Sequence, residues 1–84
     1  MDAPGPLDAA FTGKVTERLP AGSYCYLQVQ TQGGDEHWVA TVGKGHAIGT
    51  AVRVKSMGVR EDFRSRRLMR TFDRLLFGIV RADS

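Results

Sequence analysis

The chain has 84 residues, of which 42% are hydrophobic and 25% charged, and its net charge is +3. This length indicates one domain, because two halves of about 40 residues rarely fold without disulfides or metals. No apolar run of about 18 residues is present, so we expect no membrane insertion. The single cysteine, Cys25, excludes an internal disulfide and a Cys-rich zinc site.

Residues 1–10 are expected to form a flexible tail, because Pro4, Gly5 and Pro6 disfavour regular structure. They lack the basic start and the apolar core of a signal peptide. We therefore expect a cytoplasmic protein, or a periplasmic one if Met1 replaces a cleaved leader.

Alternation of apolar and polar residues then predicts four β-strands, separated by turns rich in glycine or proline. The strands cover residues 11–19, 24–31, 36–42 and 50–57. The second strand alternates most clearly. Its predicted core face carries Cys25, Leu27 and Val29, and its outward face carries Tyr24, Tyr26, Gln28 and Gln30.

The last third of the chain fits two structures. The spacing of its apolar residues is that of an amphipathic helix capped by Ser65, with Leu68, Phe72, Leu75, Leu76 and Ile79 on one face. The competing interpretation is a loop over 59–71 followed by a strand over 72–80, in which Leu75, Phe77 and Ile79 share a face. Periodicity by itself favours the helix.

Several short motifs in order resemble a family of small bacterial OB-fold proteins. They are Gly13-Lys14-Val15, residues 22–27, Trp38-Val39-Ala40, Asp62-Phe63-Arg64-Ser65 and Leu68-Met69-Arg70-Thr71-Phe72-Asp73. Members of this family are often exported. Some are NrfJ-type accessory proteins of periplasmic cytochrome c nitrite reductase systems, and many are described as DNA-binding. The chain departs from the family in having Cys25 between the tyrosines and Val59 where a second methionine is usual.

The resemblance implies that residues 72–80 form a closing strand, against the periodicity. The predicted fold is therefore all-β: a five-stranded Greek-key OB-type barrel over residues 11–81, with a short irregular or helical segment near Arg64–Met69. Residues 82–84 would be a second tail. The predicted core is Val15, Leu27, Val29, Val39, Val52, Val54, Leu75, Phe77 and Ile79.

Three aromatic residues and a basic run are the candidate binding residues. Tyr24, Tyr26 and Trp38 fall on the second and third strands, where exposed rings either stack bases or pack over an end of the barrel. Residues 53–74 carry a net charge of +5, against −2 for the rest of the chain. The candidate cations are Arg53, Lys55, Arg64, Arg66, Arg67 and Arg70.

The alternative for these cations is a solvated face with local ion pairs. Glu61, Asp62 and Asp73 lie within the same run, and an Arg70–Asp73 pair would fix the loop to the closing strand. The charge is local, which is compatible with a polyanionic partner and equally with a solvated arginine-rich face that keeps a small domain soluble.

The sequence contains no pattern typical of an enzyme. The potential metal ligands Cys25, His37, His46, Met57 and Met69 are scattered, and no catalytic or phosphate-loop motif occurs. We expect no cofactor and no metal. The predicted function is a monomeric, non-enzymatic OB-fold module that binds single-stranded nucleic acid or another polyanion. The alternative is an exported accessory protein that docks on a periplasmic redox enzyme or its maturation machinery.

Overall fold

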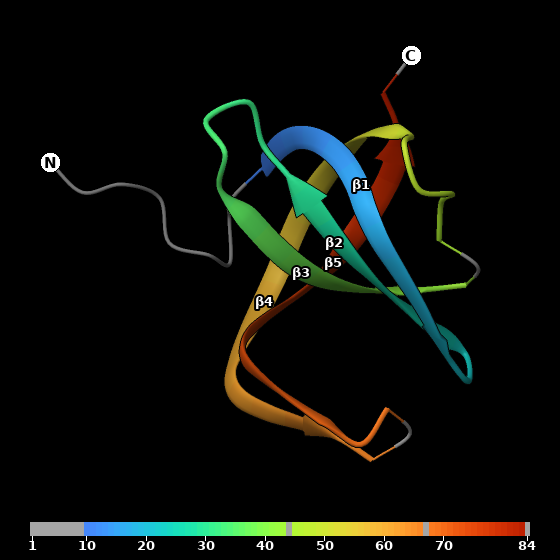
Figure 1. The fold of residues 1–84 in the computed structure, drawn as a ribbon, viewed down its shortest axis with the longest axis vertical. Helices are drawn as coiled ribbons and strands as arrows, with labels where there is room; N and C mark the ends of the chain where they lie inside the picture. Colours follow the sequence, from blue (N-terminus) through green and yellow to red (C-terminus); the bar gives the residue numbers. More distant parts are fainter. Residues whose placement is uncertain (1–9, 44, 67, 84) are drawn as a thin grey trace, which may run out of the picture.

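The computed structural model describes residues 10–43, 45–66 and 68–83. Five β-strands follow one another along the chain: β1 (Ala10–Ala21), β2 (Tyr24–Gln30), β3 (Glu36–Val42), β4 (Ala51–Ser65) and β5 (Arg70–Ala82). They form one closed sheet in the order β1-β2-β3-β5-β4, with β4 pairing back to β1 (Figure 1). No helix in the described part of the chain has the length and apolar character needed to cross a membrane.

The predicted all-β class and the five strands are confirmed, and the helical interpretation of the last third is wrong. The expected end of the fourth strand is wrong, and so is the extent of the loop over 59–71. Only a turn that includes Arg66, Leu68 and Met69 remains, within the segment near Arg64–Met69 that was expected to be irregular or helical. A register shift between Ser56 and Gly58 absorbs one residue, so β4 continues to Ser65 instead of ending at the glycine. The segment before β5 is therefore a long hairpin with a short turn, and we call residues 58–77 the β4–β5 hairpin.

β1 closes the sheet because its two halves have different partners. Residues 10–14 pair with β4, and residues 14–21 pair with β2. Gly13 lies where the strand passes from one partner to the other. A Cβ there would come within 2.5 Å of the Gln30 carbonyl oxygen, so the close approach of β1 to β2 requires glycine.

The β3–β5 junction is the shortest in the sheet. The two strands run parallel and pair over only three positions, Trp38 with Leu75, Val39 with Leu76 and Ala40 with Phe77. The strands part on both sides of this junction, and a hollow opens on each side.

The barrel interior holds an aliphatic cluster, here called the inner cluster. Its buried members are Val15, Cys25, Leu27, Val29, Val39, Val52, Val54, Leu76 and Val80. Six of the nine predicted core residues belong to it, and each of these six is fully buried. Alternation along β2 and β4 therefore predicted the inward faces of both strands correctly.

The predicted face of β5 is wrong by one residue. Leu76 and Val80 point into the barrel, whereas Ile79 is 43% exposed and Phe77 is half-buried. Leu75 is buried as predicted, but on the outside of the barrel. A shift of one residue exchanges the two faces of a strand, and the apolar residues on both faces of β5 made the two registers hard to distinguish.

A second buried cluster lies outside the barrel and is called the outer cluster. Its buried members are Tyr26, Ala40, Phe72 and Leu75, joined by the partly buried Leu19, Ala21, Trp38, Phe63, Leu68 and Phe77. The aromatic rings of Tyr26 and Phe72 stack with their centroids 5.3 Å apart. The β4–β5 hairpin thus packs against the outer face of β2 and β3, which buries a tyrosine that the sequence predicted to be exposed.

Candidate functional site

The structure places eight of the nine predicted binding residues, and it places them in separate regions. Trp38 and Arg70 meet beside the β3–β5 junction, and Arg64 and Arg66 are exposed at the end of the hairpin. Tyr24, Arg53 and Lys55 lie on the barrel wall, at the other side of the junction. Tyr26 is 7% exposed in the outer cluster and cannot stack a ligand, which corrects its predicted role. Arg67 lies outside the described residues.

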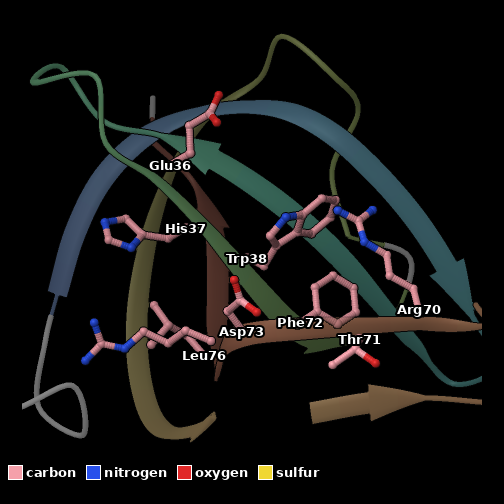
Figure 2. Close-up of a pocket in the computed structure, with 9 residues that line it drawn as sticks. Glu36, His37, Trp38, Arg70, Thr71, Phe72, Asp73 and Leu76 are labelled. Atoms are coloured by element: carbon pink, nitrogen blue, oxygen red, sulfur yellow. The ribbon is translucent and has the colours of Figure 1, made fainter. Parts of the chain in front are cut away.

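The first hollow has a volume of about 310 Å³ and lies where β3 and β5 part before their junction. We call it the Trp38 hollow. Residues 36–38 of β3 form one wall, and residues 70–74 of β5 with Leu76 form the other (Figure 2). Both walls are strand segments, so the backbone that carries these side chains belongs to the sheet.

Arg70 forms the best-defined contact of the hollow. Its guanidinium carbon lies 4.6 Å from the centroid of the Trp38 ring and 4.9 Å from that of Phe72 (Figure 2). A guanidinium over an aromatic face is attracted by the ring quadrupole and keeps its N–H groups free for a ligand. The predicted ion pair between Arg70 and Asp73 is absent, so the rings and not the carboxylate orient this arginine.

The charges around the hollow balance one another. Arg70 and Arg74 contribute two positive charges, and Glu36 and Asp73 contribute two negative charges. Glu36 also accepts a hydrogen bond of 3.5 Å from the Gln28 side-chain amide. The hollow therefore combines an aromatic wall with both donors and acceptors. This chemistry suits a planar group that carries both kinds of hydrogen-bonding atom.

The end of the hairpin adds positive charge close to the hollow. Arg64 lies opposite Thr71 in the β4–β5 ladder, and Thr71 itself lines the hollow. Arg64 and Arg66 are both exposed. In the part of the chain that the structure describes, neither arginine forms an ion pair with Glu61, Asp62 or Asp73, so both guanidinium groups are available to an anion.

The barrel wall carries a separate set of cations. Arg53 and Lys55 flank Ile79 together with Arg81, a residue that the sequence analysis did not select. Arg53 contacts Asp83 at 3.9 Å. Strand alternation from Ile79 places Arg81 on the same face, and this signal was missed because Arg81 lies outside the basic run. Phe72 and Arg74 line the Trp38 hollow but were not selected either. Phe72 was assigned only to the closing strand, and Arg74 was counted only in the charge of the basic run.

Within residues 10–43, 45–66 and 68–83, no three His, Cys, Asp or Glu side chains are grouped so that they can hold a metal ion. Comparison of the chain with protein-family models, with curated proteins and with solved structures finds no match.

Proposed function

We propose that the protein is a non-enzymatic module that binds single-stranded nucleic acid, with one base in the Trp38 hollow and phosphates along the end of the hairpin. The observation that carries the proposal is the stack of Arg70 on Trp38 and Phe72 at the open side of the hollow. Because the stack exists in the free protein, ligand binding costs little additional ordering of these side chains.

The strand order supports an OB-type Greek-key barrel. OB-folds bind oligonucleotides on the face of their second and third strands and with the loop between the fourth and fifth. Trp38 lies on β3, and Arg70 is the first residue of β5, directly after the hairpin turn. The candidate residues therefore occupy the two elements that this fold class uses for nucleic acids, although a fold alone does not establish a function.

The balanced charge of the hollow favours a base over a bare phosphate. A phosphate in the hollow would meet the carboxylates of Glu36 and Asp73, which repel it. A base presents amino donors that carboxylates accept, and carbonyl and ring-nitrogen acceptors that guanidinium groups satisfy. The exposed Arg64 and Arg66 are better placed for the phosphates, since they lie beside the hollow and outside it.

A base must be unstacked and unpaired to enter such a hollow, so the proposed ligand is a single strand. The test is a titration with an oligonucleotide of about ten nucleotides in about 50 mM salt, followed by the fluorescence of Trp38, the only tryptophan. We expect quenching, and an affinity that falls as salt rises because counterions are released on binding.

A matched pair of double variants distinguishes binding at a defined site from general electrostatic attraction to a basic protein. Arg64→Gln with Arg66→Gln should weaken binding by about tenfold, because two phosphate contacts are lost. Arg53→Gln with Lys55→Gln removes the same charge from the barrel wall and should change the affinity by less than about threefold. Equal losses in both variants, or no quenching in low salt, would contradict the proposal.

The second candidate function is that of an exported accessory protein that docks on a periplasmic redox enzyme or its maturation machinery. The observation that favours it is a group of exposed apolar side chains on the barrel wall, which includes Val42 and Met57. An oligonucleotide that produces no response would leave this candidate standing.

A further inference from the structure

Exposed apolar side chains gather on the far side of the β3–β5 junction. The described residues include six large hydrophobic side chains that are exposed, and four of them line one shallow hollow of about 260 Å³. These four are Tyr24 (43% exposed), Val42 (72%), Met57 (60%) and Ile79 (43%). Together with the half-buried Phe77 they form what we call the Ile79 surface.

The topology explains why this surface stays open. Pairing between β3 and β5 ends at Ala40 and Phe77, and beyond this point Val42 and Ile79 stand on strands that part. The hairpin covers the outer face of the sheet only on the opposite side of the junction, where it buries Phe72 and Leu75. A contiguous apolar group on a small domain is typical of an interaction site, because isolated exposed hydrophobic residues are ordinary but grouped ones are not.

Cations border the Ile79 surface on one side. Ile79 also lines the adjoining hollow, whose other walls are Arg53, Lys55 and Arg81. Arg53 lies directly opposite Arg81 in the β4–β5 ladder, and like charges at opposed positions destabilise a sheet. Asp83 contacts Arg53 at 3.9 Å and offsets part of this positive charge, whereas Lys55 and Arg81 have no such carboxylate in the lining of the hollow. An anionic partner would relieve this repulsion.

We infer that the Ile79 surface binds a segment of another protein in which apolar side chains alternate with Asp or Glu. The apolar side chains cover Val42, Met57 and Ile79, and the carboxylates meet Lys55 and Arg81. A second copy of the chain fits less well, because a two-fold interface uses the same patch on both subunits, and neither hollow of this patch is lined by an Asp or Glu that could meet Lys55 and Arg81. A nucleic acid also fits less well, since its bases need flat aromatic partners and only Tyr24 is aromatic among the four exposed side chains.

This inference names the partner chemistry of the second candidate function and is independent of nucleic-acid binding at the Trp38 hollow. The test begins with selection from a random twelve-residue peptide library displayed on phage, using the full chain as bait. The most enriched peptide is then synthesised with a fluorescent label, and its affinity is measured by anisotropy. We expect enriched peptides to combine Asp or Glu with aliphatic or aromatic residues.

Near-isosteric variants locate the binding surface. Val42→Thr with Met57→Gln keeps the shape of the surface but removes its apolar character, and should weaken the peptide by about tenfold or more. Lys55→Gln with Arg81→Gln should weaken it about three- to tenfold and reduce the salt dependence. The matched control is Ile48→Thr with Met69→Gln, which likewise replaces two exposed apolar side chains by polar ones, here at positions that are 65% and 80% exposed and lie outside the Ile79 surface. The control should bind as the wild type does.

The inference is overturned if no peptide is enriched, or if the enriched peptides lack acidic residues. It is also overturned if the Val42/Met57 variant and the control bind the peptide equally well, or if the wild-type chain self-associates and the Val42/Met57 variant does not. An oligonucleotide affinity that falls in the Val42/Met57 variant would also overturn it, because the surface would then belong to nucleic-acid binding. If the peptide binds and the oligonucleotide does not, the inference stands and the proposed function fails.

Discussion

The two buried clusters of this domain are built from different residues and do different work. The inner cluster is aliphatic, draws on all five strands and is enclosed by the sheet. The outer cluster is rich in aromatic rings and is open at the edge where Trp38 is only half-buried. The same packing that buries Tyr26 and Phe72 places Arg70 over the indole ring. The outer cluster therefore combines stability with the positioning of a site, whereas the inner cluster serves stability alone.

The largest effect is expected inside the barrel. Leu27→Ala should lower the free energy of unfolding by about 4 kcal/mol, because a closed sheet cannot collapse into the cavity that the substitution leaves. A domain of this size has little more stability than that to lose. Urea denaturation followed by Trp38 fluorescence measures the change, and a loss below about 1 kcal/mol would show that Leu27 is not in a closed core.

A slightly smaller and more local effect is expected in the outer cluster. Phe72→Ala should cost about 3 kcal/mol, because the end of the hairpin is able to settle partly into the space. Hydrogen exchange sharpens the comparison with the barrel. Amides of the hairpin, residues 58–77, should lose protection while those of β1 and β2 keep theirs, since the hairpin opens without the barrel. Uniform loss over all strands would mean that the two clusters form one cooperative unit.

Two residues of β5 distinguish its faces. Leu76→Thr should destabilise the protein by about 2 kcal/mol, because a hydroxyl enters the inner cluster without a partner. Ile79→Thr, three residues further along the strand, should change stability by less than about 0.5 kcal/mol, since this side chain is on the outer face and 43% exposed. If Ile79→Thr lowered the melting temperature more than Leu76→Thr does, Ile79 would be the inward-facing residue, as the sequence predicted.

The smallest effect concerns the cation over the rings. Arg70→Gln should lower stability by about 0.5–1 kcal/mol, the value of an exposed cation–π contact, and should shift the emission of Trp38. Arg74→Gln is the control, because this exposed residue lies on the same strand and its guanidinium contacts no aromatic ring of the described residues. If both variants changed stability and Trp38 emission equally, the contact of Arg70 with the rings would contribute nothing specific.

Alternation predicted those parts of the fold in which only one face is buried. Val52 and Val54 alternate with the exposed Arg53 and Lys55, and both were assigned correctly. The pattern failed where both faces are buried. Leu75 and Leu76 are consecutive and both buried, one in each cluster, and together with Phe72 they imitate a helical period. A hairpin that folds over the outside of a barrel leaves no such one-sided pattern for a sequence to reveal.

The candidate site was predictable in its residue types but not in its grouping. Trp38 and Arg70 were both selected, yet the contact between them depends on a parallel junction between strands that are distant in sequence. Tyr24 and Tyr26 appeared equivalent because they share a face of β2, but only Tyr26 lies under the hairpin. Arg53 and Arg70 belong to one basic run in the sequence, but they lie apart in the structure. Arg53 pairs with β1 in the barrel wall, whereas Arg70 contacts Trp38 beside the β3–β5 junction. Neighbouring positions in the sequence do not reveal that the long hairpin places these residues in different regions of the fold.

The most direct test of the central claim is a chemical-shift map of the full chain, labelled with nitrogen-15 and titrated with an oligonucleotide of about ten nucleotides in about 50 mM salt. If a base enters the Trp38 hollow, the indole N–H of Trp38 and the backbone amides of Arg70 and Phe72 will shift most, and those of Lys55 and Ile79 will stay in place. The largest shifts at Lys55 and Ile79, or no shifts at all, would contradict the account.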